Sequence, residues 1–180
     1  MKKLFLIMFL LIPFSMQGQE IKFMGLEFGT NIEAFCNALK TKGLKQIVDR
    51  FEEQEFVGTF ATYNNCNIIV KATEVTKRVK SVEVQFNSVR NKEYERDRAY
   101  EEILKQYKNK YGSKLILKDK KDSLMGIEKY IVDNGKIVIE ISICGPGMLS
   151  KDCFLNVYYY SKELLHNNKE VNSQKYSNDI

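Results

Sequence analysis

Few side chains in this chain of 180 residues are able to do nucleophilic or metal chemistry. The one histidine, His166, lies in a C-terminal segment rich in Asn, Ser and Lys, outside the predicted core. A catalytic serine or cysteine usually needs a histidine within hydrogen-bond reach, and histidine is a common metal ligand. The sequence therefore excludes a Ser–His pair, a Cys–His pair and a histidine-based metal site from the core.

The remaining catalytic patterns are weak. No CxxC pair, GxGxxG pattern or P-loop occurs, and Gly145-Pro146-Gly147 is typical of a loop that breaks a strand. Glu52, Glu53 and Glu55 form a carboxylate cluster, but such a run is typical of a solvated loop. We therefore expect a protein that is not an enzyme and uses no metal or cofactor. A hydrolase that works through carboxylates alone is the remaining enzymatic alternative.

Four cysteines permit disulfides, if the chain folds in an oxidising compartment, and the sequence leaves open whether they are paired. Cys144 and Cys153 bracket an eight-residue loop between predicted neighbouring strands. Strand alternation turns them to opposite faces, so this bridge requires a bulge or twist. Cys36 faces inward from the first predicted helix and can meet Cys66 on the sheet. Its alternative role is that of a small buried apolar residue.

The candidate binding residues are three aromatic side chains, Phe154, Tyr158 and Tyr160. They alternate with Leu155, Val157 and Tyr159 along the last predicted strand, which spans 153–160. If this second set faces the helices, the three aromatics share the opposite face with Asn156. Exposed tyrosines suit partner binding, because they combine a large rigid contact area with a polar tip. The alternative is that loops pack this face or that it simply tolerates tyrosine.

The segment 91–112 must position these strands, and it carries the strongest helix pattern in the chain. Glu101 precedes Lys105 by four residues, a favourable surface pair, and Gly112 provides a left-handed stop. Apolar residues recur at helical spacing and form one stripe that needs a partner surface. This stripe contains Tyr100, Ile103, Leu104, Tyr107 and Tyr111.

A shorter helix and several strands complete the expected order. Thr30 and Glu33 match a capping box at the start of the shorter helix, and Gly43 ends it. Asn64-Asn65 and Asp133-Asn134-Gly135 are expected to turn the chain between strands. The expected strands span residues 55–63, 66–73, 79–89, 127–132, 136–144 and 153–160. Residues 114–118 are a candidate strand, and residues 21–28 alternate loosely enough to form a further short strand.

Runs of strands after each helix predict an α+β fold. We expect two main helices packed on one face of a curved antiparallel sheet of six to seven strands. Both halves share the layout of a helix followed by strands, without a convincing residue-level repeat. The sequence therefore leaves open whether the two halves arose by duplication.

The two ends of the chain differ from the predicted domain. Residues 1–18 combine Lys2 and Lys3 with a short apolar run and then Pro, Ser and Gly, which is typical of a secretory signal peptide. We expect cleavage near Gly18, one domain over residues 19–165 and a disordered tail over 166–180. No later apolar run is long enough to span a bilayer.

Charge argues against a nucleic-acid partner. The first 18 residues hold two of the 28 basic residues and no acidic one, so 26 basic and 23 acidic residues follow, a net charge of +3. Basic and acidic residues are interspersed, as on an ordinary soluble surface.

Two short motifs resemble a group of small secreted bacterial domains of unknown function. These are Gly25-Leu26-Glu27-Phe28-Gly29-Thr30 before a capped helix, and Lys110-Tyr111-Gly112 at the end of the second helix. The fold of that group is similar to that of the β-lactamase inhibitor protein, whose helices lie on the convex side of a curved antiparallel sheet. That inhibitor binds its target through the concave face, so the resemblance implies binding through the sheet.

These features together predict a secreted or periplasmic, non-enzymatic domain. We expect its helix-free sheet face to bind a protein or an envelope ligand. A structural or assembly role in the envelope, without a discrete ligand site, is the main alternative.

Overall fold

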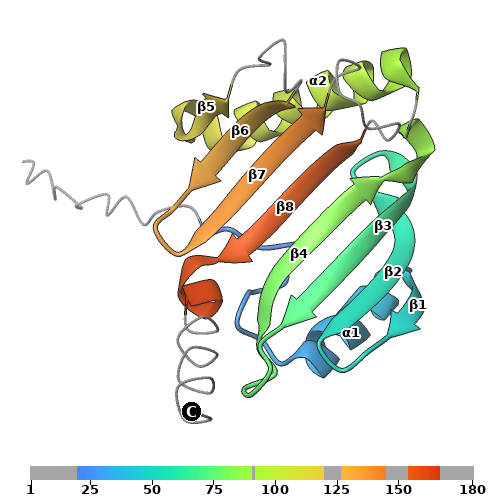
Figure 1. The fold of residues 1–180 in the computed structure, drawn as a ribbon, viewed down its shortest axis with the longest axis vertical. Coiled ribbons are helices and arrows are strands. Elements are labelled where there is room, and N and C mark those ends of the chain that lie inside the picture. Colours follow the sequence, from blue (N-terminus) through green and yellow to red (C-terminus); the bar gives the residue numbers. More distant parts are fainter. Residues whose placement is uncertain (1–19, 91, 120–126, 145–153, 167–180) are drawn as a thin grey trace, which may run out of the picture.

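A computed structural model describes residues 20–90, 92–119, 127–144 and 154–166 (Figure 1). Within them, eight strands form one antiparallel sheet in the order β1-β2-β3-β4-β8-β7-β6-β5. Two main helices lie behind the sheet in Figure 1, and none of the described helices crosses the near face. The elements are α1 (Ile32–Thr41), β1 (Lys45–Asp49), β2 (Glu53–Phe60), β3 (Tyr63–Ala72), β4 (Val79–Phe86), α2 (Glu93–Tyr111), β5 (Leu115–Asp119), β6 (Ile127–Asp133), β7 (Ile137–Cys144) and β8 (Leu155–Ser161).

The predicted α+β class and antiparallel sheet are confirmed, but the sheet has eight strands rather than six to seven. The additional strand is β1, a five-residue edge strand with only partial burial at alternate positions. Its sequence, Lys-Gln-Ile-Val-Asp, has too short a pattern to stand out from a loop. Edge strands are often short and charged, because this discourages pairing with another chain.

The sheet is built from two halves of the same design. Helix α1 precedes the four strands β1–β4, and helix α2 precedes the four strands β5–β8. The halves join where β4 pairs with β8, with Glu83 opposite Tyr158 at the middle of the five-pair ladder. The shared layout expected from the sequence is therefore present in the topology.

Helix α2 buries most of its predicted stripe. Ile103 has no exposed surface, whereas Leu104 is only partly buried and lies at the margin of the core. Ala99 and the side chain of Arg96 take buried positions that the stripe omitted. Gly112 ends the helix with a φ of 57°, a left-handed conformation that suits glycine.

The start of α1 corrects the predicted capping box. Asn31, not Thr30, is the capping residue, and its Oδ1 accepts a hydrogen bond of 2.9 Å from the backbone N–H of Glu33. The Thr30 hydroxyl instead donates to the backbone oxygen of Glu27. Asn and Thr both suit the capping position, so the sequence alone did not distinguish Asn31 from the neighbouring Thr30.

Residues 21–28 do not form the further short strand. Phe23 and Leu26 exchange two backbone hydrogen bonds around Met24 and Gly25, both of which have positive φ. The segment therefore makes a tight turn. This turn buries the Phe23 ring 5.6 Å from that of Phe60 and 5.2 Å from that of Tyr159.

The turn between β2 and β3 is also displaced from its predicted place. Phe60 pairs with Tyr63, so the chain reverses at residues 61–62 rather than at Asn64-Asn65. Asn65 does adopt a positive φ of 55°, but at the irregularity in register beside Gly58. Asn65 therefore adopts the left-handed conformation that Asn tolerates, but it does so within the strand irregularity and not in the turn.

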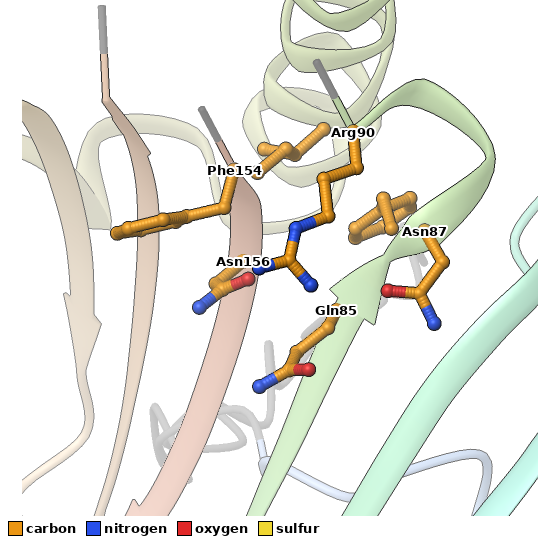
Figure 2. A pocket seen from close by; sticks show the side chains of 7 residues that line it. Gln85, Asn87, Arg90, Phe154 and Asn156 are labelled. Atoms are coloured by element: carbon orange, nitrogen blue, oxygen red, sulfur yellow. The ribbon is translucent and has the colours of Figure 1, made fainter. Parts of the chain in front are cut away.

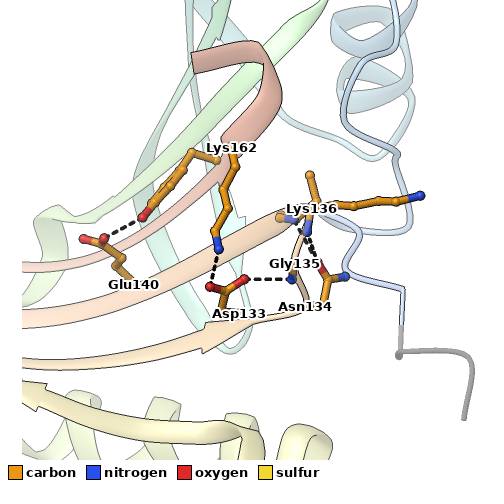
Figure 3. Close-up of polar contacts among 8 residues, drawn as sticks. Asp133, Asn134, Gly135, Lys136, Glu140 and Lys162 are labelled. Atoms are coloured by element: carbon orange, nitrogen blue, oxygen red, sulfur yellow. Dashed lines mark hydrogen bonds and ion pairs between the residues drawn. The ribbon is translucent and has the colours of Figure 1, made fainter. Parts of the chain in front are cut away.

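The hairpin predicted at Asp133-Asn134-Gly135 is confirmed (Figure 3). The Asp133 carboxylate accepts a hydrogen bond from the N–H of Gly135, whose φ is 89°. Asn134 Oδ1 accepts from the N–H groups of Lys136 and Ile137. The turn thereby satisfies its own backbone donors and fixes the register of β6 against β7.

Candidate binding face

Strand β8 separates its side chains as the sequence predicts. Leu155, Val157 and Tyr159 are at most 5% exposed, and the Tyr159 hydroxyl contacts that of Tyr107 on α2. Phe154, Asn156, Tyr158 and Tyr160 are half-buried at the alternate positions. The three candidate aromatics therefore lie on the helix-free side of the sheet.

Tyr158 occupies the middle of this face, between two glutamates. In the antiparallel ladders it lies opposite Glu83 of β4 and opposite Glu140 of β7. Directly opposed side chains on neighbouring strands are in contact range. The centre of the face is thus an aromatic ring with a carboxylate on either side.

Tyr160 is held beside Tyr158 by two contacts. The ring centroids of the two tyrosines lie 5.4 Å apart, and the Tyr160 hydroxyl donates a 3.0 Å hydrogen bond to Glu140 (Figure 3). Burial and then the charge of Glu140 raise the pKa of Tyr160 to about 12. The phenol therefore stays protonated at neutral pH and presents a fixed ring edge.

Polar side chains elsewhere on the face are tied to one another. Gln85 and Asn156 each donate a 2.9 Å hydrogen bond to Glu83 Oε1. Lys71 lies 3.0 Å from Glu53, and Lys129 lies 3.4 Å from Glu140. These contacts fix the orientation of the groups that surround the two tyrosines.

A pocket of about 210 Å³ lies at one end of the aromatic row. Figure 2 shows the Arg90 guanidinium extending between Asn87 and Asn156 towards Gln85, with Phe154 at the side. Amides donate and accept hydrogen bonds, and a guanidinium donates several. The arrangement is suited to recognition of a polar group next to an apolar wall.

Sequence reasoning found Phe154 but missed Asn87 and Arg90. Both residues follow β4, Asn87 in the 3₁₀ turn Asn87–Val89 and Arg90 immediately after it. The sequence predicted a strand as far as residue 89, so it gave no reason to assign Asn87 and Arg90 to a binding site. The switch from extended chain to a turn at Phe86 brings them to the end of β8, and no sequence pattern signalled that neighbour.

The structure does not join Cys36 to Cys66: both are buried free cysteines, as the alternative of a small buried residue expects. Cys36 lines a pocket between α1 and β1 with Gln46 and Asp49. Cys66 instead contacts the backbone oxygen of Tyr63 at the β2–β3 hairpin. Burial raises the pKa of each thiol to about 11. Cys153 lies outside the described residues, so its pairing with Cys144 stays a prediction.

Three described carboxyl groups have a clearly shifted pKa, and all three are lowered. Hydrogen bonds from Lys22, Tyr63 and Lys162 are the main causes for Glu27, Glu102 and Asp133 respectively. A carboxyl group that donates a proton near neutral pH needs a raised pKa instead. These three groups are therefore suited to ion pairing rather than to acid catalysis.

Within the described ranges, no group of three or more His, Cys, Asp and Glu side chains is placed to hold a metal ion. None of the described helices has the length and apolar character required to cross a membrane. The chain matches no protein-family model, no curated protein and no solved structure.

Proposed function

We propose that the protein is a secreted or periplasmic, non-enzymatic binding domain. Its helix-free sheet face recognises a protein or an envelope ligand through Phe154, Tyr158 and Tyr160. The proposed location is based on the signal-like residues 1–18, and the resemblance to small secreted domains points the same way.

The observation that carries this proposal is the pair of tyrosines at the centre of the helix-free face. Tyr158 and Tyr160 lie on the central strand β8, four strands from one sheet edge and three from the other. Helix packing does not require aromatic side chains on this side, because the core is built from the opposite face. Rigid aromatics surrounded by oriented polar groups are typical of interface centres.

The test is capture of a ligand from envelope extract by immobilised protein comprising residues 19–180. We expect a partner retained by the wild type and lost or weakened in the double variant Tyr158→Ala/Tyr160→Ala. Each substitution should weaken binding to that partner by about 1–3 kcal/mol if the tyrosines are anchors. Tyr94→Ala is the matched control, because Tyr94 is 81% exposed on α2, away from this face.

The same experiment distinguishes the proposed binding function from the main alternative. A structural or assembly role without a discrete site predicts that the double variant retains whatever the wild type retains. Equal retention by wild type, double variant and control therefore removes the basis for the proposed binding face.

A further inference from the structure

A further cavity lies on the helix-covered side of the sheet, away from the proposed binding face. It has a volume of about 250 Å³ and opens between the N-terminal turn, the β2–β3 turn and the last turns of α2. Its lining residues come from four separate parts of the chain. They are Lys22, Met24, Phe60, Ala61, Gln106, Tyr107, Lys110, Tyr111 and Tyr159.

The walls of this aromatic cavity are apolar and already in place. Phe60, Tyr107, Tyr111 and Tyr159 are each at most 8% exposed. The Tyr107 and Tyr111 rings stack at 5.9 Å, and the ring of Phe60 stacks on that of Phe23 at 5.6 Å. A ligand that enters needs no rearrangement of these rings, which lowers the entropic cost of binding.

The floor of the cavity offers a hydrogen-bond donor. The hydroxyls of Tyr107 and Tyr159 bond to each other, which uses only one of their two protons. Neither hydroxyl donates to any other residue that the structure describes. Burial raises the pKa of both phenols, so both protons are retained at neutral pH.

The rim of the cavity carries positive charge. Lys22 and Lys110 line it together with Gln106, and none of its lining residues is Asp or Glu. Glu20 and Glu27 lie 3.0 and 2.9 Å from Lys22 and partly neutralise it. The Lys110 ammonium lies 5.1 Å from the centre of the Tyr111 ring, at the mouth. An anionic group at the mouth would therefore meet Lys110.

We infer that the aromatic cavity binds a small aromatic carboxylate. Its ring lies among Met24, Phe60 and Tyr111, and its carboxylate lies at the rim beside Lys110. A ring substituent that accepts a hydrogen bond would add a contact with the second hydroxyl proton of the floor, and an unsubstituted ring binds without it. This binding site is separate from the helix-free face and does not depend on the proposed function of that face.

The test is a titration of ¹⁵N-labelled protein with 2-naphthoate, followed by amide chemical shifts. The neutral alcohol 2-naphthylmethanol, of similar size, is the comparison ligand. We expect saturable shifts centred on the β2–β3 turn, the turn at residues 23–26 and the end of α2. The carboxylate should bind about 10-fold more tightly than the alcohol, the effect of one partly screened ion pair.

Substitutions at two exposed positions on α2 distinguish the contribution of charge to ligand affinity from that of the shape of the cavity. Lys110→Gln removes the ammonium group and Gln106→Glu adds a carboxylate at almost unchanged size, so each should weaken 2-naphthoate binding about 10-fold. Neither should weaken binding of 2-naphthylmethanol. Lys108→Gln and Asn109→Asp make the same changes at exposed positions outside the lining and should leave both affinities unchanged.

Three results would overturn the inference. They are the absence of saturable shifts with 2-naphthoate, shifts confined to other parts of the protein, and equal affinity of wild type and Lys110→Gln for 2-naphthoate. All of these variants change exposed side chains, so the folded state is expected to persist and the comparison to stay valid.

Discussion

The hydroxyl groups of Tyr107 on α2 and Tyr159 on β8 hydrogen-bond to each other in the buried layer between helix and sheet. The contact ties the second helix to the central strand of the sheet. It also orients Tyr159, whose ring lies 5.2 Å from that of Phe23 and 6.2 Å from that of Phe28. The N-terminal turn, α2 and β8 therefore meet at one tyrosine.

This contact predicts a non-additive pair of substitutions. Tyr107→Phe leaves the Tyr159 hydroxyl without its partner and should cost about 1–3 kcal/mol of unfolding free energy. The double variant Tyr107→Phe/Tyr159→Phe removes both polar groups and should cost less than the sum of the two single changes. Urea unfolding of the four proteins measures the coupling. Additive costs would mean that the two hydroxyls do not stabilise each other.

Adjacent tyrosines on β8 should differ sharply in their effect on stability. Tyr159→Ala empties a buried aromatic site and should cost about 3–5 kcal/mol. Tyr158→Ala changes the helix-free face and should cost about 1 kcal/mol or less. Chemical denaturation compares them without knowledge of a ligand. Equal costs would indicate that both faces of β8 are packed, and the proposed binding face would then be dropped.

Gly58 on β2 is expected to tolerate no side chain. A Cβ placed there would lie 2.1 Å from Cδ2 of Leu44, a buried residue that leads into β1. Gly58→Ala should therefore cost about 1–3 kcal/mol through overpacking. Gly58→Ala combined with Leu44→Ala tests the cause, because removal of the opposing methyl groups should make the glycine substitution less costly. An unchanged cost in the Leu44→Ala background would place the strain elsewhere.

The sequence predicted best where one local pattern determined the structure. The alternation around Tyr159 and the Asp133-Asn134-Gly135 turn were both confirmed, because strand periodicity and left-handed turn residues act within a few residues. The helical spacing along α2 predicted the burial of Ile103 correctly for the same reason. Leu104 belongs to the same stripe but lies at its edge, where the distance to the sheet decides burial.

Features that depend on distant neighbours were missed. Leu44, which leads into strand β1, packs closely against Gly58 of β2, and no pattern within Lys45–Asp49 reveals this contact. Arg90 joins the pocket beside Phe154 only through the pairing of β4 with β8. The free state of Cys36 and Cys66 likewise depends on how α1 lies over the sheet. Tertiary contacts of this kind leave no periodic signal in the sequence.

The two buried cysteines should react slowly in the folded protein. Cys36 is 4% exposed and Cys66 has no exposed surface, and burial raises the pKa of both thiols to about 11. Little thiolate is present at pH 8, and the reagent has poor access to it. Alkylation with iodoacetamide, mapped by mass spectrometry of peptides, should modify both sites much faster in urea than in buffer. Rapid labelling of either site in buffer would show that it is accessible.

The hydrogen bond from Tyr160 to Glu140 predicts a loss of stability at high pH. The pKa of this phenol is raised from 10.0 to about 12 in the folded protein, mainly by burial and then by Glu140. The unfolded chain therefore releases this proton at lower pH than the folded protein. The contribution of Tyr160 is complete below pH 10 and is lost as the pH rises towards 12. Glu140 is partly exposed, so solvent screening reduces the size of the effect.

The variant Tyr160→Phe isolates this contribution from the other titrating groups. The difference in unfolding free energy between wild type and variant should be constant from pH 7 to 9.5 and should change between pH 10 and 11, to the disadvantage of the wild type. Urea unfolding at each pH measures it, and Tyr94→Phe controls for removal of an exposed hydroxyl. Parallel curves for wild type and Tyr160→Phe over the whole range would mean that Tyr160 titrates alike in the folded and unfolded chain. The fixed orientation assigned to its ring by Glu140 would then lack support, and Tyr158 alone would remain as the anchor at the centre of the face.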